Sequence, residues 1–248
     1  MPKIAIITGA SRGIGAATAR LAARDGYDVC VNYTRDDKSA AEVVKTCRAM
    51  GRRAFAARAD IANPEDVKAM FTACDEQLGP VSLLVNNAGV VGTATTVANL
   101  ADADLRATFE VNVFGTIFCA RSAIQRMATT RGGMGGVIVN VSSIAVNLGS
   151  PGEYVHYAAS KGAIDSFTIG LAKEVGPEGI RVNAVQAGTT DTGIHAKAGN
   201  PDRPALVAKL APLRRIAEPE DTAEAILYLA SDKASYAAGA ILRIGGGL

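Results

Sequence analysis

Seven short apolar runs alternate with longer segments of helical character along the whole 248-residue chain. Most of the runs are continuously apolar, which is typical of strands buried on both faces of a parallel sheet. The runs span residues 4–8, 28–33, 54–58, 82–87, 136–143, 180–187 and 240–244. The segments between them carry helix-start signals, such as an asparagine or glutamate followed by proline and acids at 63–66 and 218–221. We therefore predict one α/β domain over residues 1–248, with a doubly wound, seven-stranded parallel sheet covered by helices on both faces.

The composition of the chain indicates which binding partners and which cellular compartment to expect. The net charge of +2 and the lack of a dense basic cluster predict no nucleic-acid partner. No apolar run approaches the roughly 18 residues that a membrane span needs, so no membrane partner is predicted. The four cysteines lack metal-ligand spacing, and Cys30 and Cys119 lie in apolar stretches that predict buried thiols. These features predict a cytoplasmic protein without a metal site.

A glycine-rich turn follows the first apolar run. Its sequence is TGASRGIG, and a helix rich in small residues comes next. Glycines allow a tight turn and let backbone N–H groups approach a pyrophosphate at a helix N-terminus. An ordinary helix start can also contain glycines, but this turn lies after the first strand of an alternating chain, where a Rossmann-type dinucleotide site requires it. The predicted cofactor contacts in this turn are Gly9, Ser11, Arg12, Gly13, Ile14 and Gly15.

The end of the second run bears on the choice of cofactor. Asn32 and Thr34 lie there, without the acidic residue that would accept hydrogen bonds from the ribose of NAD. Arg12 and Arg35 could bind a 2′-phosphate through charge-assisted hydrogen bonds. The aspartates at 36–37 weigh against this, because either could repel that phosphate. We predict that NADP(H) is favoured over NAD(H).

Two further segments are predicted to line the cofactor crevice. Asp60 and Ile61 follow the third run, where Asp60 could accept a hydrogen bond from the adenine amino group or could equally cap a nearby turn. Asn87, Ala88 and Gly89 follow the fourth run. Their small size would let the backbone approach a cofactor, while the amide ties neighbouring strands together.

Tyr157 and Lys161 lie four residues apart in a helical segment, so their side chains share one face. An ammonium group roughly 4 Å from the phenol is worth about 4 kcal/mol at an effective dielectric of about 20. That energy corresponds to about three pKa units, enough to bring a phenol with a pKa of about 10 near neutral pH. The pair can therefore perform acid–base chemistry. How strongly it indicates a catalytic site depends on the motifs around it.

Five motifs in order carry a resemblance to a known family. They are TGASRGIG, NNAG, EVNVFG, the strand end NVSS and YAASK. In this order and spacing, over the whole chain, the sequence resembles the classical short-chain dehydrogenase/reductase family. Within that family it is most similar to bacterial glucose 1-dehydrogenase-like and 3-oxoacyl-carrier-protein reductase-like members.

The resemblance implies a catalytic tetrad. Tyr157 would be the general acid or base, and Lys161 would lower its pKa and bind the nicotinamide ribose. Ser143 would hold the substrate oxygen, with Ser142 as the alternative; strand alternation points the two to opposite faces, so only one can serve. Asn112 would hold a water that relays protons; from the residues alone it is a buried polar group at a helix kink. The resemblance also implies a homotetramer.

The segment from 188 to 215 follows the sixth run and is predicted to be a substrate lid. The resemblance assigns Gly188, Thr190 and Thr192 to the cofactor, with Thr192 at the carboxamide. The family usually has Pro-Gly where this chain has alanine and glycine at 187–188, so a more mobile loop is expected. His156 and His195 could touch substrate, although packing or solvent exposure is the more common role of isolated histidines.

Together these features predict an NADP(H)-dependent oxidoreductase that transfers a hydride to a small carbonyl substrate or from a secondary alcohol. The alternatives within the family are a 3-oxoacyl-carrier-protein reductase and a sugar (glucose) 1-dehydrogenase. A different class, a non-catalytic dinucleotide-binding sensor or scaffold, would keep the fold without turnover.

Overall fold

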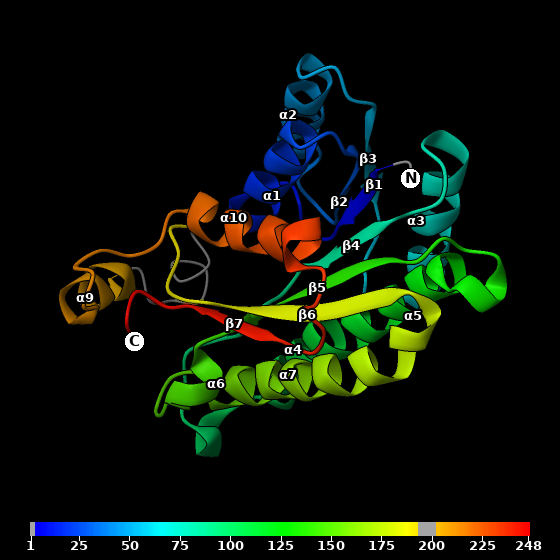
Figure 1. Cartoon of the computed structure of the whole chain (residues 1–248). Coiled ribbons are helices and arrows are strands. Elements are labelled where there is room, and N and C mark those ends of the chain that lie inside the picture. Colours follow the sequence, from blue (N-terminus) through cyan, green and yellow to red (C-terminus); the bar gives the residue numbers. More distant parts are fainter. Residues whose placement is uncertain (1–2, 193–201) are drawn as a thin grey trace.

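Seven parallel strands form one sheet at the centre of the molecule (Figure 1), in the spatial order β3-β2-β1-β4-β5-β6-β7. The structure is a computed structural model that describes residues 3–192 and 202–248. The strands are β1 (Ile4–Ile7), β2 (Asp28–Tyr33), β3 (Ala54–Arg58), β4 (Leu83–Asn86), β5 (Gly136–Ser143), β6 (Ile180–Ala187) and β7 (Ile241–Ile244). All seven predicted strands are confirmed to within one residue at each end, and so is the doubly wound parallel fold.

Helices cover both faces of this sheet. Figure 1 shows α1, α2 and α10 on one side and α4, α5 and α7 on the other. The helices are α1 (Gly13–Arg24), α2 (Asp37–Ala49), α3 (Pro64–Gln77), α4 (Asp102–Phe109), α5 (Thr116–Met127), α6 (Ala145–Leu148), α7 (Val155–Val175), α9 (Arg203–Leu210) and α10 (Pro219–Ala230). Short 3₁₀ turns lie at Val97–Asn99, Thr129–Arg131, Gly176–Glu178 and Asp232–Ala234, and a π-helical turn, η2 (Glu110–Gly115), joins α4 to α5.

Two apolar cores lie between the sheet and these helix layers. Buried residues of α1, α2 and α10 form one core with the sheet, and those of α3, α5 and α7 form the other. The strand residues feed both cores in alternation: Ile6 belongs to one and Ile7 to the other, and both are completely buried. This double burial explains why the strands read as continuous apolar runs.

The predicted helix starts are observed. The Asn63 side chain accepts a hydrogen bond from the Glu65 N–H at 3.0 Å, and Pro64 follows as the first helical residue of α3. Proline suits this position because its missing N–H would have no partner within the helix. At α10, the backbone N–H of Glu218 donates to Asp221 at 2.8 Å, which completes a capping box.

The strand order reverses between β1 and β4, since the chain runs outward from β1 to β3 and then returns to the other side of β1. At such a switch point, crossover connections leave the sheet in opposite directions and open a crevice at the carboxyl ends of the strands. The functional site is therefore expected beyond the ends of β1, β4, β5 and β6.

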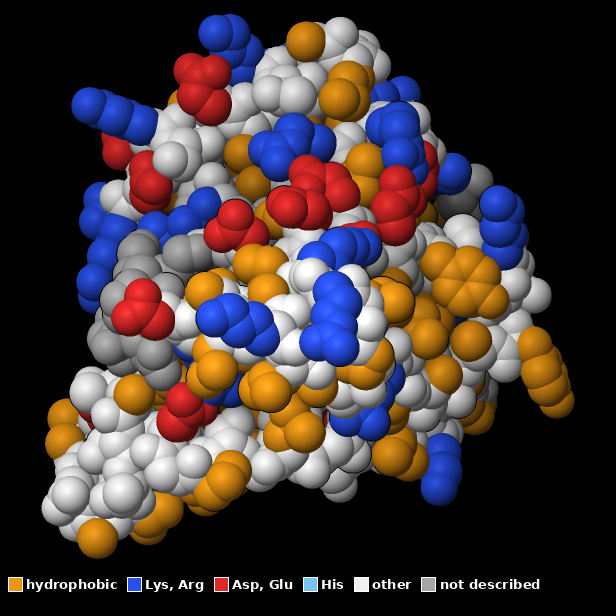
Figure 2. Space-filling view, turned by 90° about the vertical axis from the view of Figure 1, so that its left-hand side faces the viewer, with side chains coloured by type: hydrophobic (Ala, Val, Ile, Leu, Met, Phe, Trp, Pro, Cys, Tyr) orange, Lys and Arg blue, Asp and Glu red, His pale blue; other side chains and the backbone are white. Residues whose placement is uncertain are grey.

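All four cysteines are buried free thiols, as predicted for Cys30 and Cys119. Within residues 3–192 and 202–248, no helix has the length and apolarity needed to cross a membrane. Figure 2 views the molecule from the side on which α9 lies in Figure 1, and apolar side chains gather across the middle and lower part of that face. Three leucines of the segment 206–213 are more than half exposed: Leu206, Leu210 and Leu213.

Candidate active site

A cavity of about 680 Å³ lies at the switch point. Its wall is built from the segments that follow β1, β4, β5 and β6, together with α7 and α9. Ten of the predicted site residues line it, not counting three members of the predicted tetrad, Ser143, Tyr157 and Lys161, which are discussed below. They are Arg12, Gly13, Ile14, Arg35, Asn87, Ala88, Gly89, Gly188, Thr190 and Thr192. The tertiary structure thus brings together segments that are up to 180 residues apart.

The glycine turn is tightly packed against the segment that follows β4. Gly9 and Gly13 have φ values of +61° and +54°, which other residues adopt only with strain. A Cβ on Gly9 would lie 2.9 Å from the Cα of Ala88, and one on Gly15 would lie 2.5 Å from the Gly9 carbonyl oxygen. The Asn87 amide donates to the Thr8 carbonyl at 2.9 Å and fixes this contact. Only glycine fits at these positions.

Asn32 holds the glycine turn in place through hydrogen bonds of its side chain. Its side-chain oxygen accepts a hydrogen bond from the Gly9 N–H at 3.1 Å, and its amide donates to the carbonyls of Ala57 and Ala59 at 3.3 and 3.0 Å. The side chain is 1 % exposed. It therefore orders the phosphate-binding turn, and a direct contact of Asn32 with the cofactor stays a prediction.

The end of β2 presents Arg35 to the cavity, as expected, while Thr34 is exposed beside it. Asp36 accepts a hydrogen bond from the Ser39 N–H at 3.1 Å and caps α2. Its carboxylate is thus directed to the helix N-terminus, where a negative charge is favourable. This geometry weakens the objection that the acid at 36 would repel a phosphate.

Asp60 makes the turn-capping contact that was the alternative to adenine binding. Its carboxylate accepts a hydrogen bond from the Ala62 N–H at 3.0 Å. Ile61 is 3 % exposed and packs against Gly115, where a Cβ would lie 2.7 Å from the Ile61 side chain. In the described part of the chain, neither residue lines the cavity; nor do Gly9, Ser11, Gly15, Asn32 and Thr34. Their cofactor contacts stay predictions.

Asn112 lies in the π-helical turn η2, which is the helix irregularity that the residues alone suggested. Its side-chain oxygen accepts from the Val90 N–H at 2.8 Å, and its amide donates to the Val90 carbonyl at 2.8 Å and to Ser160 Oγ at 3.0 Å. The extra residue of a π turn re-aims the side chain, a feature frequent at functional sites. Asn112 is completely buried and clamps the segment after β4 against α7.

Lys161, in α7, is also buried. Its Nζ donates to the Val141 carbonyl at 2.7 Å and lies 5.8 Å from the centre of the Tyr157 ring. A Cβ on Gly89 would lie 3.5 Å from this Nζ and 3.2 Å from Asn112 Oδ1, so Gly89 packs closely against both side chains. Burial lowers the pKa of Lys161 to about 8, and the negative charge of Asp165 acts in the opposite direction.

Tyr157 differs from the sequence-based expectation. Burial raises its pKa above the usual value of 10, and a hydrogen bond with Ser143 partly offsets that rise. The predicted lowering by Lys161 is wrong for this geometry, because the ammonium lies over the ring and is held by a backbone carbonyl. The phenol is therefore protonated at neutral pH.

Ser143, and not Ser142, is the serine that meets Tyr157. Ser143 shares a hydrogen bond with Tyr157 and accepts one from the Ala145 N–H at 3.1 Å. The Ser142 hydroxyl donates instead to the Lys161 backbone carbonyl at 3.3 Å. The two serines are used differently because consecutive strand residues point to opposite faces.

The start of the predicted lid closes over the glycine turn. A Cβ on Gly13 would lie 2.9 Å from the Thr192 methyl group, so the segment 188–192 and the turn are in close contact. His156 is 5 % exposed, and its Nε2 lies 3.0 Å from the Val91 carbonyl oxygen, which is a packing role. His195 lies outside the described residues.

Arg203, Tyr154 and Ser150 also line the cavity and were missed by sequence reasoning. Arg203 donates a hydrogen bond to Glu153, and its guanidinium lies 5.5 Å from the centre of the Tyr154 ring. No local motif marks these residues, because the pairing joins positions 50 apart. In the described ranges, no group of three or more His, Cys, Asp or Glu side chains is arranged to hold a metal ion.

Comparison with known proteins agrees with this site. A family model described as enoyl-(acyl carrier protein) reductase matches residues 9–248. An uncharacterised oxidoreductase of Escherichia coli is 49 % identical over 98 % of this chain and 99 % of its own length. An L-rhamnose 1-dehydrogenase (NAD(P)(+)) of a Sphingomonas species is 39 % identical over 99 % of this chain and 96 % of its own.

Solved structures also match nearly the whole chain. A blue fluorescent protein from a metagenomic library, in complex with NADPH, superimposes with a TM-score of 0.90 and 34 % identity. The match covers 99 % of this chain and 97 % of that one. The chain belongs to the short-chain dehydrogenase/reductase family and is an oxidoreductase of alcohol and carbonyl groups with a dinucleotide-binding site.

Proposed function

We propose that this protein is an NADP(H)-dependent oxidoreductase that transfers a hydride between the nicotinamide and a small carbonyl or secondary-alcohol substrate, with Tyr157 as general acid and base. The observation that carries the proposal is the meeting of Tyr157, Lys161 and Ser143 in one cavity beside the glycine turn. The three residues come from β5 and α7, which are rigid elements of the core.

The turn around Gly9 and Gly13 fits a dinucleotide. It leaves no room for a Cβ, and it leads into the N-terminus of α1, where free N–H groups favour a phosphate. Arg12 and Arg35 line the same cavity and would bind a 2′-phosphate. When bound, the nicotinamide accepts or supplies the hydride. The protein orients the substrate and manages the proton.

The proton chemistry follows from burial. In carbonyl reduction, the Tyr157 hydroxyl would donate its proton to the substrate oxygen while Ser143 holds that oxygen in place. A raised phenol pKa keeps Tyr157 protonated at neutral pH, which favours the reductive direction. In oxidation the phenolate must accept the proton, so the rate in that direction should increase with pH. Lys161, with a pKa of about 8, changes charge within the working range.

Replacing Tyr157 by Phe tests the mechanism. The variant keeps the ring and its packing but removes the acid, so NADP binding should be retained and turnover lost by about two to four orders of magnitude. Turnover is measured by NADPH absorbance across ketones, acyl thioesters and sugars, and binding by thermal shift. Tyr228→Phe is the matched control, because Tyr228 lies half-exposed on α10. Equal turnover in Tyr157→Phe and wild type would disprove the role.

Cofactor choice has a separate test. NADP should raise the melting temperature more than NAD at equal concentration, because only NADP carries the 2′-phosphate that Arg12 and Arg35 would bind. Arg35→Ala should narrow the difference between the two cofactors. A larger rise with NAD would refute the proposed role of the two arginines.

Two substrate alternatives compete within this reaction class, a 3-oxoacyl-carrier-protein reductase and a sugar 1-dehydrogenase. The 39 % identity to an L-rhamnose 1-dehydrogenase favours sugar chemistry. A non-catalytic sensor or scaffold would bind NADP and fail to turn over every substrate in the panel. The same assay therefore separates all three.

We also propose a cytoplasmic homotetramer. Four buried free thiols are consistent with a reducing compartment. Phe114 in η2 and Val155 and Ile169 in α7 are large apolar side chains that are 37–49 % exposed, on the helices that would pack against partner copies. Light scattering after size-exclusion chromatography measures the assembly, and a monomer would contradict it.

A further inference from the structure

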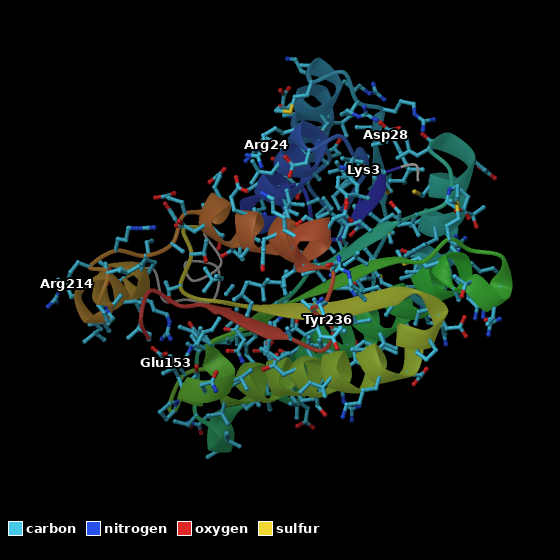
Figure 3. All side chains as sticks on the ribbon, in the orientation of Figure 1. Lys3, Arg24, Asp28, Glu153, Arg214 and Tyr236 are labelled. Atoms are coloured by element: carbon cyan, nitrogen blue, oxygen red, sulfur yellow. The ribbon has the colours of Figure 1, made fainter. Side chains whose placement is uncertain are left out.

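Asp165, in α7, is a partly buried acidic residue that the proposed reaction does not use. It lies one helical turn after Lys161, on the same face of the helix. α7 packs against β6, and side chains fill the space between the two elements (Figure 3). There the side-chain amide of Gln186, in β6, donates a hydrogen bond to Asp165 Oδ2 at 2.7 Å. Gln186 is 5 % exposed, so this contact is shielded from water.

The sheet fixes where Asp165 lies relative to Lys161. Ser142 and Gln186 are paired in the register of β5 and β6, so their side chains point to the same face of the sheet. Ser142 donates to the Lys161 backbone carbonyl at 3.3 Å, and Gln186 donates to Asp165 one turn further along α7. Two neighbouring strands therefore attach the same face of α7 at Lys161 and at Asp165.

The hydrogen bond from Gln186 does not by itself require a carboxylate. The amide oxygen of an asparagine would accept the same bond without the cost of burying a charge. Asp165 Oδ1 is also buried, and it has no hydrogen-bond partner among the described residues. An unpaired buried oxygen of this kind is unfavourable. The charge of Asp165 therefore needs a reason other than the packing of α7 on β6.

Lys161 is the group that gains from this charge. Its buried Nζ donates to the Val141 carbonyl, which is a neutral acceptor. Burial lowers the pKa of Lys161 to about 8, and the negative charge of Asp165 opposes that lowering. Loss of the Asp165 charge would therefore lower the pKa of Lys161 further, toward neutral pH.

The other charged groups around α7 do not replace Asp165. The elements that pack most extensively against α7 are β5, β6, α4, α6 and the turns at Glu110–Gly115 and Gly176–Glu178, and of these β5 and α6 carry no ionisable side chain. The charged residues of the remaining elements, and of β7 beside Gln186, are Asp102, Asp104, Arg106, Glu110, Glu178, Arg181 and Arg243. Among the charged groups that the structure describes, Asp165 alone acts on the pKa of Lys161.

We propose that Asp165, held in place by Gln186, is a positioning residue that keeps the Lys161 ammonium charged at the pH at which the enzyme works. This inference rests on the proposed function. The Val141 carbonyl accepts from one N–H group of the ammonium, and the other two would bind the ribose of the nicotinamide cofactor. Hydrogen bonds from a charged nitrogen are roughly twice as strong as those from a neutral one, so the charged form is the more active. Asp165 does not line the cavity and takes no part in the bond changes.

Asp165→Asn separates the charge from the hydrogen bond, because the asparagine oxygen can still accept from Gln186. The kcat/KM for ketone reduction is measured from pH 6 to pH 9.5. In the wild type it should decrease with a midpoint set by the Lys161 pKa of about 8. Removal of a negative charge one helical turn away should lower this midpoint by about one pH unit at an effective dielectric of about 20. The variant should then be about fivefold slower at pH 8 and nearly equal to the wild type at about pH 6.

Two control variants distinguish this charge from other effects. Glu174→Gln removes the same charge at an exposed position of the same helix, and the midpoint should not move. Asp165→Glu keeps the charge while it changes the length of the side chain. Its midpoint should stay close to that of the wild type, although its hydrogen bond with Gln186 is altered.

Stability provides a second measurement that does not depend on turnover or on a bound cofactor. The unfolding free energy of Lys161→Met is compared with that of the wild type, and the same comparison is made in the Asp165→Asn background. In the wild-type background the difference should begin to change near pH 8, where folded Lys161 loses its proton. In the Asp165→Asn background it should begin to change at about pH 7, because the lower pKa in the folded chain widens the pH window.

The inference requires both shifts. It is overturned if Asp165→Asn keeps the wild-type midpoint, if its activity falls equally at every pH, or if the change in stability begins at the same pH in both backgrounds. In each of these cases the proposed function stands, because Tyr157→Phe tests it separately. Absence of turnover by the wild type with every carbonyl and alcohol tested would instead refute the proposed function, and the inference with it.

Discussion

Replacing Lys161 by Met should abolish catalysis and at the same time stabilise the cofactor-free protein at neutral pH. Lys161 is 5 % exposed, and its pKa falls from 10.5 in an exposed lysine to about 8 in the folded chain. Burial of the ammonium is the main cause, and Asp165 offsets only part of it. Methionine has a similar length and carries no charge, so it fills the same space without the cost of burying a charge.

The magnitude and sign follow from proton linkage. The difference between the two pKa values corresponds to about 3 kcal/mol at roughly 1.4 kcal/mol per pKa unit. Between about pH 8 and 10.5 the unfolded chain binds more protons at this site than the folded chain, so wild-type stability should increase with pH across that window. Below pH 8, both states are protonated and the full cost is present. The advantage of the variant should therefore shrink by about 3 kcal/mol between pH 7 and pH 10.5.

Urea unfolding of wild type and variant at several pH values, with equal protein concentrations and no cofactor, measures this difference. Lys173→Met is the matched control, because Lys173 is an exposed lysine on the same helix and its replacement should change stability little at any pH. A stability difference between Lys161→Met and wild type that does not depend on pH would refute the reasoning. A variant that is less stable at pH 7 would also refute it.

Two further predictions concern the scaffold of the site. Gly15→Ala should destabilise the protein by about 1–3 kcal/mol and abolish the thermal shift with NADP, because the new methyl would lie 2.5 Å from the Gly9 carbonyl oxygen. The same substitution at Gly170, where an added Cβ meets no described atom within 4 Å, should instead stabilise α7 by about 0.5–1 kcal/mol; equal effects at the two sites would contradict this account. Asn112→Ala should cost about 2–4 kcal/mol in urea unfolding, because it leaves both backbone groups of Val90 without their side-chain partner, and a loss below about 0.5 kcal/mol would show that the clamp is dispensable.

Local patterns were enough to predict the sheet and the glycine turn. The strands are continuous apolar runs because both faces of the sheet are covered. Each strand can therefore be recognised from its own residues. Gly9 and Gly13 are equally local, since their positive φ values disfavour any other residue whatever surrounds them. Asn63 and Pro64 start α3 through contacts within a few residues. Such features need no knowledge of the rest of the fold.

Other features depended on which distant segments meet. Asn32 was placed at the cofactor site by its position after the second strand, and only the folded chain shows that its side chain bonds to Gly9 and to Ala57 of β3. Its contact with a cofactor stays a prediction. The pKa of Tyr157 was predicted to be lowered by Lys161, and it is raised, because desolvation by the surrounding core outweighs the hydrogen bond with Ser143. A pKa depends on burial and on exact partners, and neither can be calculated from spacing along a helix.

The sequence by itself thus determined the α/β fold and the glycine-rich turn, because each is carried by a short pattern with a local physical cause. Its resemblance to a family singled out Asn112, Ser143, Tyr157 and Lys161 as the candidate catalytic groups. The tertiary structure decided how those groups are tuned and what surrounds them. Val90 holds Asn112 across 22 residues, and Arg203 meets Glu153 across 50. Long-range contacts of this kind arise from packing of the whole domain, and they set the charge and shape that the substrate encounters.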